Sequence, residues 1–372
     1  MRILLPLLLA VSAYGADKHV LVEDFESAGL GYCPRMHEAL MHIRADYPFD
    51  EVAVVCNHAG DSYSNDYSNY RKSYCAITGY PTALVNYLYR LTGTYSTWEQ
   101  NYTWISMRVD NQLNQSSPGT LNIVYDDNGG SVDVHSTFCL DDNLGSSASV
   151  WMLVYEDQVD SYGLLSQGGT TTPESVSISD PGEYATYDWT FNVDSGWDDD
   201  ELNLVAFVQY TSGDKAVIQV DTAHLYLDGT DDDAPEVSGL YPSDGQSSIP
   251  VGTPLYFHIF DQTGVNTSTL DFSVSSPDRV PERRGNALSV GHSTLGEITG
   301  TLDVDDSDPR HVVCTFTPDD DLPMGTEITC TVDSGLADTD GNTTTSDMVW
   351  TFDVSGVGVV GSTWGQIKAL SD

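Results

Sequence analysis

The spacing of apolar residues changes near residue 118, and this change constrains the fold more than any other feature. Upstream, residues 18–117 alternate short apolar runs, such as Val52–Cys56, with stretches of helical spacing. Continuous apolar runs of this length are typical of strands covered on both faces, and strand–helix–strand order favours a parallel α/β sheet. Downstream, residues 118–229 alternate apolar and polar positions between turns, which predicts an antiparallel β-sandwich. The Ser-, Gly- and Thr-rich stretch 161–181 is expected to be a surface excursion.

A second β-sandwich module is predicted at residues 234–354, after an acidic linker that contains Asp231, Asp232 and Asp233. We therefore expect a multidomain chain in which one α/β domain precedes two antiparallel β-sandwich modules. Residues 355–372 are expected to form a C-terminal tail.

Residues 1–15 have the pattern of a secretory signal peptide. Arg2 supplies the positive start, residues 3–11 are apolar, and Ala13 and Gly15 place small side chains before the expected cleavage point. No later segment is long and apolar enough to span a bilayer. We expect an exported protein without a transmembrane segment, located outside the cell, in the periplasm or at the outer surface.

The charge balance narrows the choice of partners. The chain has 56 acidic and 14 basic residues, which gives a formal net charge of −42. Such a chain repels nucleic acid and anionic membranes. Because the acidic residues are spread along the sequence, they indicate solubility in a salty exterior more than a specific cation store. The expected partner is a protein or a polysaccharide outside the cytoplasm, and not a nucleic acid.

The stretch from Val20 to Arg35 contains the strongest candidate for chemistry. A short apolar strand is followed by a turn of small residues and then by Cys33 at the start of a helix. The free N–H groups and the dipole of a helix N-terminus lower the pKa of an exposed thiol placed there. This layout resembles a thioredoxin-like active site. Residues 76–82 resemble the segment of that family whose cis-proline, here Pro81, faces the dithiol.

The resemblance implies an incomplete redox pair. In the Cys-x-x-Cys motif of the family, the exposed nucleophile falls at Leu30, and Cys33 matches the second, resolving cysteine. Thiol–disulfide exchange needs both thiols. Cys33 is therefore interpreted as an inert buried thiol or as one end of a structural disulfide. The alternative is an envelope oxidoreductase that uses Cys33 with Cys75 or Cys56.

The same resemblance implies a binding surface at Tyr80 and Pro81. In the family, the cis peptide exposes the backbone of the preceding residue, here Tyr80, to an extended substrate. A domain without redox chemistry could keep this groove for a peptide. The other interpretation is that Pro81 is retained only for the fold.

Two further resemblances concern the modules: one covers the first two modules together, and the other covers the last module. Residues 18–227 are similar to a bacterial cell-envelope family that is named for a twenty-eight-kilodalton outer membrane protein and pairs a thioredoxin-like half with a β-sandwich half. The last module resembles bacterial Ig-like domains of surface-layer proteins through residues 261–266, 316–318 and 337–342. No Walker loop, HExxH or nucleophile-elbow motif accompanies them.

The last module also contains a predicted disulfide and a candidate calcium loop. Cys314 and Cys330 are expected to face each other across a hairpin and form a disulfide. Asp338 and Asp340 alternate as in calcium-binding loops, although an ordinary Asp–Gly turn explains them better. The acidic linker at 231–233 is a second position where calcium could bind.

No other cofactor or metal site is predicted. His37 and His42 lie five residues apart, which does not suit a pair of ligands on one helix face, and His58 has no further ligand at a metal-site spacing. All three are interpreted as surface or loop histidines. The sequence therefore predicts a secreted or cell-envelope protein with a redox-degenerate thioredoxin-like domain and a non-enzymatic binding or structural role.

Overall fold

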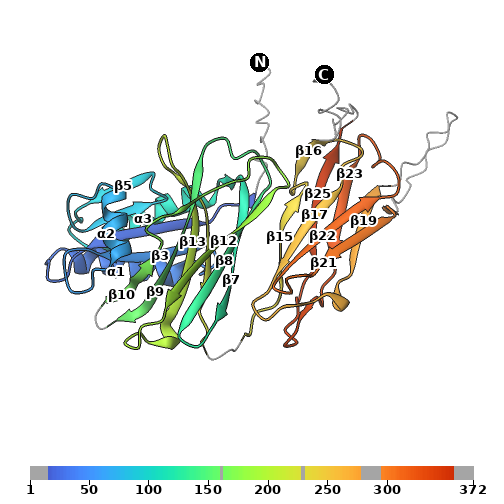
Figure 1. Cartoon of the computed structure of the whole chain (residues 1–372). Coiled ribbons are helices and arrows are strands. Elements are labelled where there is room, and N and C mark those ends of the chain that lie inside the picture. Colours follow the sequence, from blue (N-terminus) through green and yellow to red (C-terminus); the bar gives the residue numbers. More distant parts are fainter. Residues whose placement is uncertain (1–15, 160–161, 228–230, 278–294, 356–372) are drawn as a thin grey trace, which may run out of the picture.

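The computed structural model describes residues 16–159, 162–227, 231–277 and 295–355, so the predicted signal peptide and C-terminal tail lie outside the described residues. An α/β region and a β-sandwich form one end of the molecule, and a second β-rich module forms the other (Figure 1). The predicted order of a mixed α/β region followed by β-rich parts is therefore confirmed. Within the described ranges, no helix is long and apolar enough to cross a membrane.

The α/β region is built on two parallel strands, β2 (Val20–Glu26) and β3 (Val52–His58), which are joined by helix α1 (Cys33–Asp46). Every residue of both strands is buried, as the apolar run Val52–Cys56 predicts for β3, although β2 also contains Glu23, Asp24 and Glu26. The expectation of parallel pairing fails at β4 (Thr82–Val85), which runs antiparallel to β2, and at β5 (Tyr89–Thr92), which runs antiparallel to β4. A tight turn with positive φ at Asn86 and Tyr87 joins β4 to β5, so no crossover helix is needed.

Helices cover both faces of this sheet. Helices α1 and α3 (Trp98–Leu113) pack against each other and on β2 and β3, whereas α2 (Asp66–Tyr74) lies on the opposite face. Asn65 caps α2 by accepting a hydrogen bond from the Ser68 N–H, and the Ser68 hydroxyl accepts one from the Asn65 N–H.

The sandwich has two layers that enclose a single apolar core. One layer is the sheet β12-β8-β7, and the other consists of β9, β13 and β14. The bounds of these strands are β7 (Gly119–Asp127), β8 (Ser131–Leu140), β9 (Ala148–Val159), β12 (Tyr184–Asn192), β13 (Leu202–Tyr210) and β14 (Val217–His224). The short strands β1 (Ala16–Asp17) and β6 (Ser116–Ser117) pair beside it, and β11 (Glu174–Ser175) pairs with β9.

The α/β region and the sandwich share one sheet, in the order β14-β13-β9-β10-β3-β2-β4-β5. Strand β10 (Tyr162–Gly169) joins them, because it pairs with β9 on one side and reaches β3 through Leu165 and Cys56 on the other. The expectation that 161–181 is a surface excursion is therefore wrong at this strand. Leu164 and Leu165 are buried, and Gly169 lies where a Cβ atom would meet the ring of Tyr67 at 2.5 Å.

The C-terminal module is a β-sandwich with its own apolar core. Its main sheets have the orders β15-β17-β22-β21 and β16-β25-β23-β19-β20, and β18 pairs with β24. The bounds are β15 (Glu236–Tyr241), β16 (Gln246–Ile249), β17 (Leu255–Phe260), β18 (Val265–Asn266), β19 (Phe272–Pro277), β20 (Leu295–Glu297), β21 (Gly300–Asp305), β22 (His311–Pro318), β23 (Glu327–Val332), β24 (Ala337–Asp338) and β25 (Met348–Val354). Short 3-10 turns lie at Asp199–Glu201 and Thr267–Thr269.

The predicted hairpin disulfide is not present. Cys314 lies on β22 and Cys330 on β23, and these strands belong to different sheets, so they do not form a hairpin. Both thiols are buried in the same core cluster and both are free, as are the other four cysteines. The connection between β22 and β23 crosses from one sheet to the other, which the spacing of the two cysteines does not reveal.

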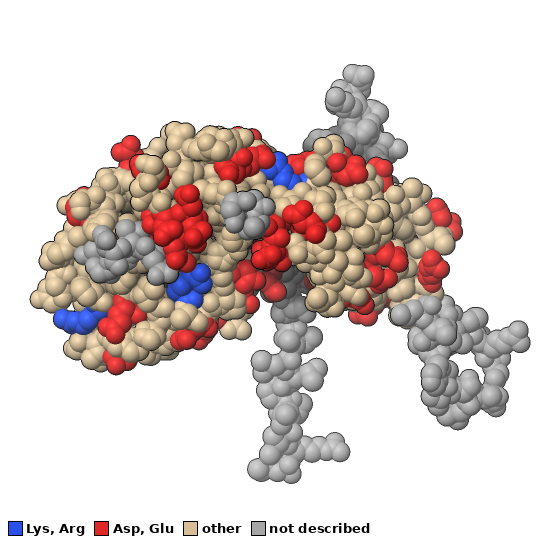
Figure 2. All heavy atoms as spheres, turned by 90° about the horizontal axis from the view of Figure 1, so that it is seen from below, with Lys and Arg blue, Asp and Glu red and all other residues tan. Residues whose placement is uncertain are grey.

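Polar contacts join the sandwich to the C-terminal module. The Gln262 side chain accepts a hydrogen bond from the Tyr125 N–H (3.0 Å) and donates one to the Tyr125 carbonyl (2.6 Å). Arg310 of the C-terminal module forms an ion pair with Asp126, which follows Tyr125 on β7. On the face drawn in Figure 2, acidic side chains are spread over both ends of the molecule and basic side chains are few.

Candidate functional site

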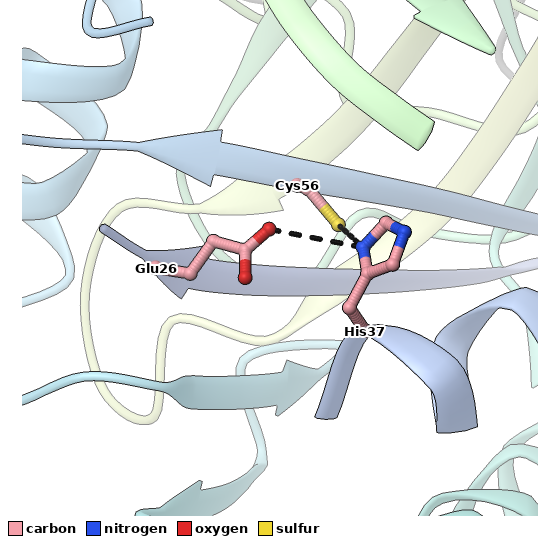
Figure 3. A group of neighbouring side chains, drawn as sticks. All are labelled: Glu26, His37 and Cys56. Atoms are coloured by element: carbon pink, nitrogen blue, oxygen red, sulfur yellow. Dashed lines mark hydrogen bonds and ion pairs between the residues drawn. The ribbon is translucent and has the colours of Figure 1, made fainter. Parts of the chain in front are cut away.

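A buried polar cluster lies where β2 and β3 end and α1 begins (Figure 3). Glu26 is the last residue of β2, Cys56 lies near the end of β3, and His37 lies in the first turns of α1. The carboxyl ends of parallel strands meet at one edge of a sheet, so β2 and β3 deliver their side chains to the same place. Gly29, with a φ of 81°, turns the chain from β2 toward α1.

The cluster is organised around the Glu26 carboxylate. Its Oε1 atom lies 3.0 Å from Nε2 of His58 and 3.8 Å from Nδ1 of His37. Nδ1 of His58 lies 2.8 Å from Oδ2 of Asp61, and Sγ of Cys56 lies 4.0 Å from Nδ1 of His37. The side chains of Glu26 and His58 are fully buried. The interpretation of His58 as a surface or loop histidine is therefore wrong, because it fills the space between two acidic groups inside the fold.

His58 bridges these two carboxylates, whose negative charges favour its protonated form. Burial lowers the pKa of His58, but hydrogen bonds to Glu26 and Asp61, together with their negative charges, outweigh that effect and raise the pKa above its ordinary value. In turn, burial raises the pKa of Asp61, while hydrogen bonds from the Ala28 N–H and from His58 lower it more strongly. The three side chains form a compact ion-paired network.

Glu26, His37 and Cys56 place three potential metal ligands within 4.8 Å of one another. A carboxylate, an imidazole and a thiolate are ligands that zinc accepts. However, the Gly163 N–H donates a hydrogen bond to Nε2 of His37 (3.2 Å). An imidazole that accepts at Nε2 carries its proton on Nδ1, which is the atom that would have to bind the metal. The residues as arranged therefore form a hydrogen-bonded network and do not fit a bound metal.

The thiols near this cluster are held in the protonated form. Burial raises the pKa of Cys33 to about 11, the Ser27 backbone opposes this shift, and the charges of Glu26, Asp24 and Asp61 add to it. Burial, followed by the charges of Glu26 and Asp24, also raises the pKa of Cys56 well above its ordinary value. The helix N-terminus at Cys33 does not overcome these effects. The arrangement holds protons and lacks an activated nucleophile.

The structure places the candidate cysteines differently with respect to Cys33. Cys33 is 2% exposed, and it lies close enough to Cys56 that a thiolate at Cys33 raises the pKa of Cys56. Cys75 packs instead with Phe25. Because successive residues of a strand point to opposite faces, Phe25 and Cys75 lie on the other side of the sheet from Glu26. Of the two possible partners for Cys33, only Cys56 is therefore on its side.

Exposed apolar side chains surround the entrance to α1. Leu30 is 43% exposed, Tyr32 63% and Tyr95 42%. Arg35 connects Tyr32 to Tyr95, because its guanidinium lies 5.7 Å from the centre of the Tyr32 ring and donates a hydrogen bond to the Tyr95 carbonyl (3.1 Å). We call these four residues the aromatic patch.

Tyr80 and Pro81 directly precede β4, and Pro81 is buried. The Tyr80–Pro81 peptide is cis, as in the family that the segment resembles. The Gly93 N–H donates to the Pro81 carbonyl (2.8 Å), and Gly93 begins the loop that leads to Tyr95. The Tyr80 ring is half-buried under the Lys72 ammonium, 5.1 Å from the ring centre.

The structure separates the two residues of the candidate calcium loop. Asp338 is 1% exposed, whereas Asp340 is exposed. Asp338 lies instead with Asp231 and Asp261, and one ligand atom of each is within 4.8 Å of the others. Burial raises the pKa of Asp231, and it raises the pKa of Asp261 to about 6. Sequence spacing marked the linker and the Asp338 loop separately, but it did not indicate that they meet.

Comparisons with known proteins assign only the C-terminal module. Residues 231–354 match the family model described as bacterial Ig-like domain. No curated protein matches the chain. This module suggests a surface or exported protein.

Solved structures resemble the chain weakly. One is red sea bream transglutaminase, with 14% identity and a TM-score of 0.24 over 71% of this chain and 34% of that chain. Another is purple acid phosphatase PPD1 from yellow lupin (Lupinus luteus) seeds, with 12% identity and a TM-score of 0.20 over 63% of this chain and 41% of that chain. The chain thus spans well under half the length of either protein, and these scores are too low to indicate a shared fold.

Proposed function

We propose that the chain is an exported, non-enzymatic binding protein whose α/β region contacts the partner through the aromatic patch. One observation carries this proposal. The position that would hold a redox nucleophile is occupied by the exposed Leu30, while Cys33 is 2% exposed and has its pKa raised to about 11. The surface at this site therefore offers apolar contact area and no reactive thiol.

The electrostatics oppose disulfide exchange. A thiol with a pKa near 11 is ionised in only about one molecule in ten thousand at pH 7. The carboxylates of Glu26, Asp24 and Asp61 all raise this pKa, which is the opposite of the electropositive setting that activates a cysteine. An enzyme that used Cys33 as a nucleophile would have to form a thiolate that the neighbouring carboxylates disfavour.

The aromatic patch has the composition of a binding surface. Tyr and Arg side chains that combine apolar area with polar tips are enriched where proteins bind partners. Leu30, Tyr32 and Tyr95 expose such area. The loop that carries Tyr95 begins at Gly93, whose N–H donates to the Pro81 carbonyl, and at the matching cis-proline the resembling family receives an extended chain. We infer that the occupant is an extended peptide segment of a protein outside the cytoplasm. The two β-rich modules would then hold this surface away from the point of attachment.

One specific observation favours the second candidate, a thiol–disulfide oxidoreductase, over inert thiols. Cys33 and Cys56 lie on the same side of the sheet and are electrostatically coupled. In a disulfide between them, a substrate thiolate would attack one sulfur and the other sulfur would leave as a thiolate, but both sulfurs are buried.

Reduction of insulin disulfides by the full mature protein in the presence of dithiothreitol separates the two candidates. We expect the wild type to be no faster than dithiothreitol alone. Turnover above that background, abolished in Cys33→Ser, would overturn the non-enzymatic proposal.

Peptide binding is tested with reduced and alkylated insulin B chain, which is extended and carries no free thiol. Titration calorimetry should detect binding to the wild type and at least about tenfold weaker binding to Tyr32→Ala. Met107→Ala is the matched control, because Met107 has the same exposed fraction as Tyr32, 63%, but lies on α3 and is not part of the aromatic patch. Equal affinities for the wild type and both variants, or binding of a polysaccharide instead of the peptide, would contradict a peptide site at the aromatic patch.

A further inference from the structure

Three buried aspartates from separate segments meet beside the junction of the sandwich and the Ig-like domain. Asp231 precedes β15, Asp261 directly follows β17, and Asp338 ends β24. They are 9%, 6% and 1% exposed, and one carboxylate oxygen of each lies within 4.8 Å of the others. Like charges this close repel one another strongly when they are removed from water.

No basic side chain of the described residues forms an ion pair with this cluster. Among the described residues, the ion pairs include none that involves Asp231, Asp261 or Asp338. Oδ2 of Asp231 is buried and has no hydrogen-bond partner. The nearby Thr263 hydroxyl donates to Asp261 (3.1 Å). A buried carboxylate oxygen without a donor costs free energy, so a positive ligand at this position would be favourable.

The other oxygens of the cluster are held in place by the chain. Oδ1 of Asp261 accepts hydrogen bonds from the N–H groups of Thr263 (2.9 Å) and Gly264 (2.7 Å). The Asn342 amide donates to Oδ2 of Asp338 (2.7 Å) and to the Asp231 carbonyl (2.8 Å). The Asp233 N–H donates to Oδ1 of Asp231 (3.0 Å). These contacts fix the three carboxylates before any ligand arrives, which lowers the entropic cost of binding.

The ligand chemistry selects a hard divalent cation. All three groups are carboxylates, and no thiol or imidazole is among them. Calcium accepts carboxylate oxygens in flexible geometry, whereas magnesium demands a near-ideal octahedron and retains several waters. We propose that Asp231, Asp261 and Asp338 bind one calcium ion.

Calcium at this position would stiffen the joint between the two modules. Asp261 is adjacent to Gln262, which forms both hydrogen bonds to the Tyr125 backbone of the sandwich. Asp231 lies at the end of the linker that enters the Ig-like domain. The ion therefore ties the linker to two loops of the Ig-like domain, one of which contacts the sandwich. This inference goes beyond the binding function proposed above and does not depend on it.

Calcium titration of the EDTA-treated full protein tests the proposal, with calorimetry and thermal unfolding as the two readouts. We expect one ion per chain with affinity in the range of extracellular modules, about 10⁻⁴–10⁻³ M, and a higher Tm in calcium than in EDTA. Magnesium at the same concentration should produce a smaller shift.

Asp231→Asn and Asp338→Asn should bind calcium at least about tenfold more weakly and lose the Tm shift. Their Tm in EDTA should equal or exceed that of the wild type, because each variant removes one repelling charge. Asp232→Asn and Asp340→Asn are the matched controls, because these neighbouring aspartates are exposed. Calcium responses that are absent in the wild type, or equal in the cluster variants and the controls, would overturn the proposal.

Discussion

The guanidinium of Arg71 forms a two-pronged ion pair with Glu23, with Nε 2.8 Å from Oε1 and Nη2 2.7 Å from Oε2. Its remaining nitrogen, Nη1, donates to Gln209 on β13 (2.7 Å). Arg71 lies on α2 of the α/β region, is fully buried, and stacks 4.6 Å from the centre of the Trp151 ring of β9. One side chain thus connects the α/β region to the sandwich across the shared sheet.

Loss of this side chain should destabilise both parts together. Arg71→Met leaves the Glu23 carboxylate buried without its cationic partner and with only a hydrogen bond from Asn57 (3.4 Å). Breaking such a pair costs about 3–5 kcal/mol of unfolding free energy. Urea unfolding followed by far-UV circular dichroism and by tryptophan fluorescence should show coincident transitions, because the two parts share one sheet.

Lys72→Met is the control for this experiment. Lys72 is the next residue of α2 and loses the same charge, but it is only half-buried and contacts Tyr80. Its cost should remain below about 1 kcal/mol. Similar losses for both variants, or two separate unfolding transitions, would contradict the connection made by Arg71.

Gly169 should tolerate no side chain, although it lies in a Gly-rich stretch. A Cβ atom there would meet the Tyr67 ring at 2.5 Å and the Met152 carbonyl at 2.8 Å. Gly169→Ala should cost about 1–3 kcal/mol in urea unfolding. The adjacent Gly168→Ala would meet only Val154, at 4.0 Å, and should be nearly neutral. Equal effects of the two substitutions would show that Gly169 is not needed for close packing.

These glycines explain why part of the fold was not predictable. The apolar run Val52–Cys56 indicated β3 correctly, because a strand that is covered on both faces is rich in apolar residues. Strand β10 carries only Leu164 and Leu165 as large apolar residues, and its glycines are typical of loops. Gly169 is required because α2 and β9 approach it closely, and a single sequence does not record which distant element approaches a given residue.

In the candidate sites, too, some features were predictable from local sequence and others depend on tertiary structure. The strand, turn and helix around Cys33 follow from local pattern, and the cis peptide at Pro81 agrees with the resemblance. The acidic surroundings of Cys33 depend on the side on which Glu26 and Asp24 emerge, which is set by strand register. Local pattern thus indicated where the site lies, whereas tertiary structure determines its chemistry.

Free thiols are a direct test of the cysteine chemistry. All six cysteines are free and buried in the structure. Titration with a thiol reagent should detect six thiols in the unreduced, denatured protein and few in the native protein, where burial raises the pKa of Cys314 to about 12. A count of four thiols, with Cys314 linked to Cys330 by mass spectrometry, would instead support the disulfide predicted from the sequence.

Leu30→Cys should create disulfide reductase activity. The new thiol would be placed at a side chain that is 43% exposed, and the Leu30 carbonyl accepts a hydrogen bond from the Cys33 N–H at the start of α1. It would supply the accessible nucleophile that the wild type lacks. Insulin reduction should rise above the wild-type background and return to it in Leu30→Cys combined with Cys33→Ser.

Leu30→Ser is the control for Leu30→Cys, because it makes a change of similar size without a thiol. Activity in Leu30→Ser would show that the gain comes from loosening the loop. An inactive Leu30→Cys variant would show that the site geometry does not support exchange.

Acid should loosen the contact between the Ig-like domain and the sandwich through His258. This side chain is 3% exposed, its Nδ1 lies 2.8 Å from Nε2 of His311, and its ring contacts Tyr184 of β12. Burial, with a smaller contribution from the charge of His311, lowers the pKa of His258 to about 3. The unfolded chain takes up this proton near pH 6.5. The folded protein therefore has its full stability above that pH and loses stability as the pH falls from 6.5 toward 3.

At pH 5 this single group should cost about 2 kcal/mol of unfolding free energy relative to pH 7.5. Because carboxylates also titrate in acid, the informative quantity is the difference between variants. His258→Phe retains an aromatic ring beside Tyr184 and should lose less stability between these two pH values than the wild type, by about the same 2 kcal/mol. His42→Phe removes an exposed histidine that stacks on Trp98 and should follow the wild type. If His258→Phe and the wild type lost equal stability in urea unfolding at the two pH values, His258 would not be the group that makes this contact sensitive to acid.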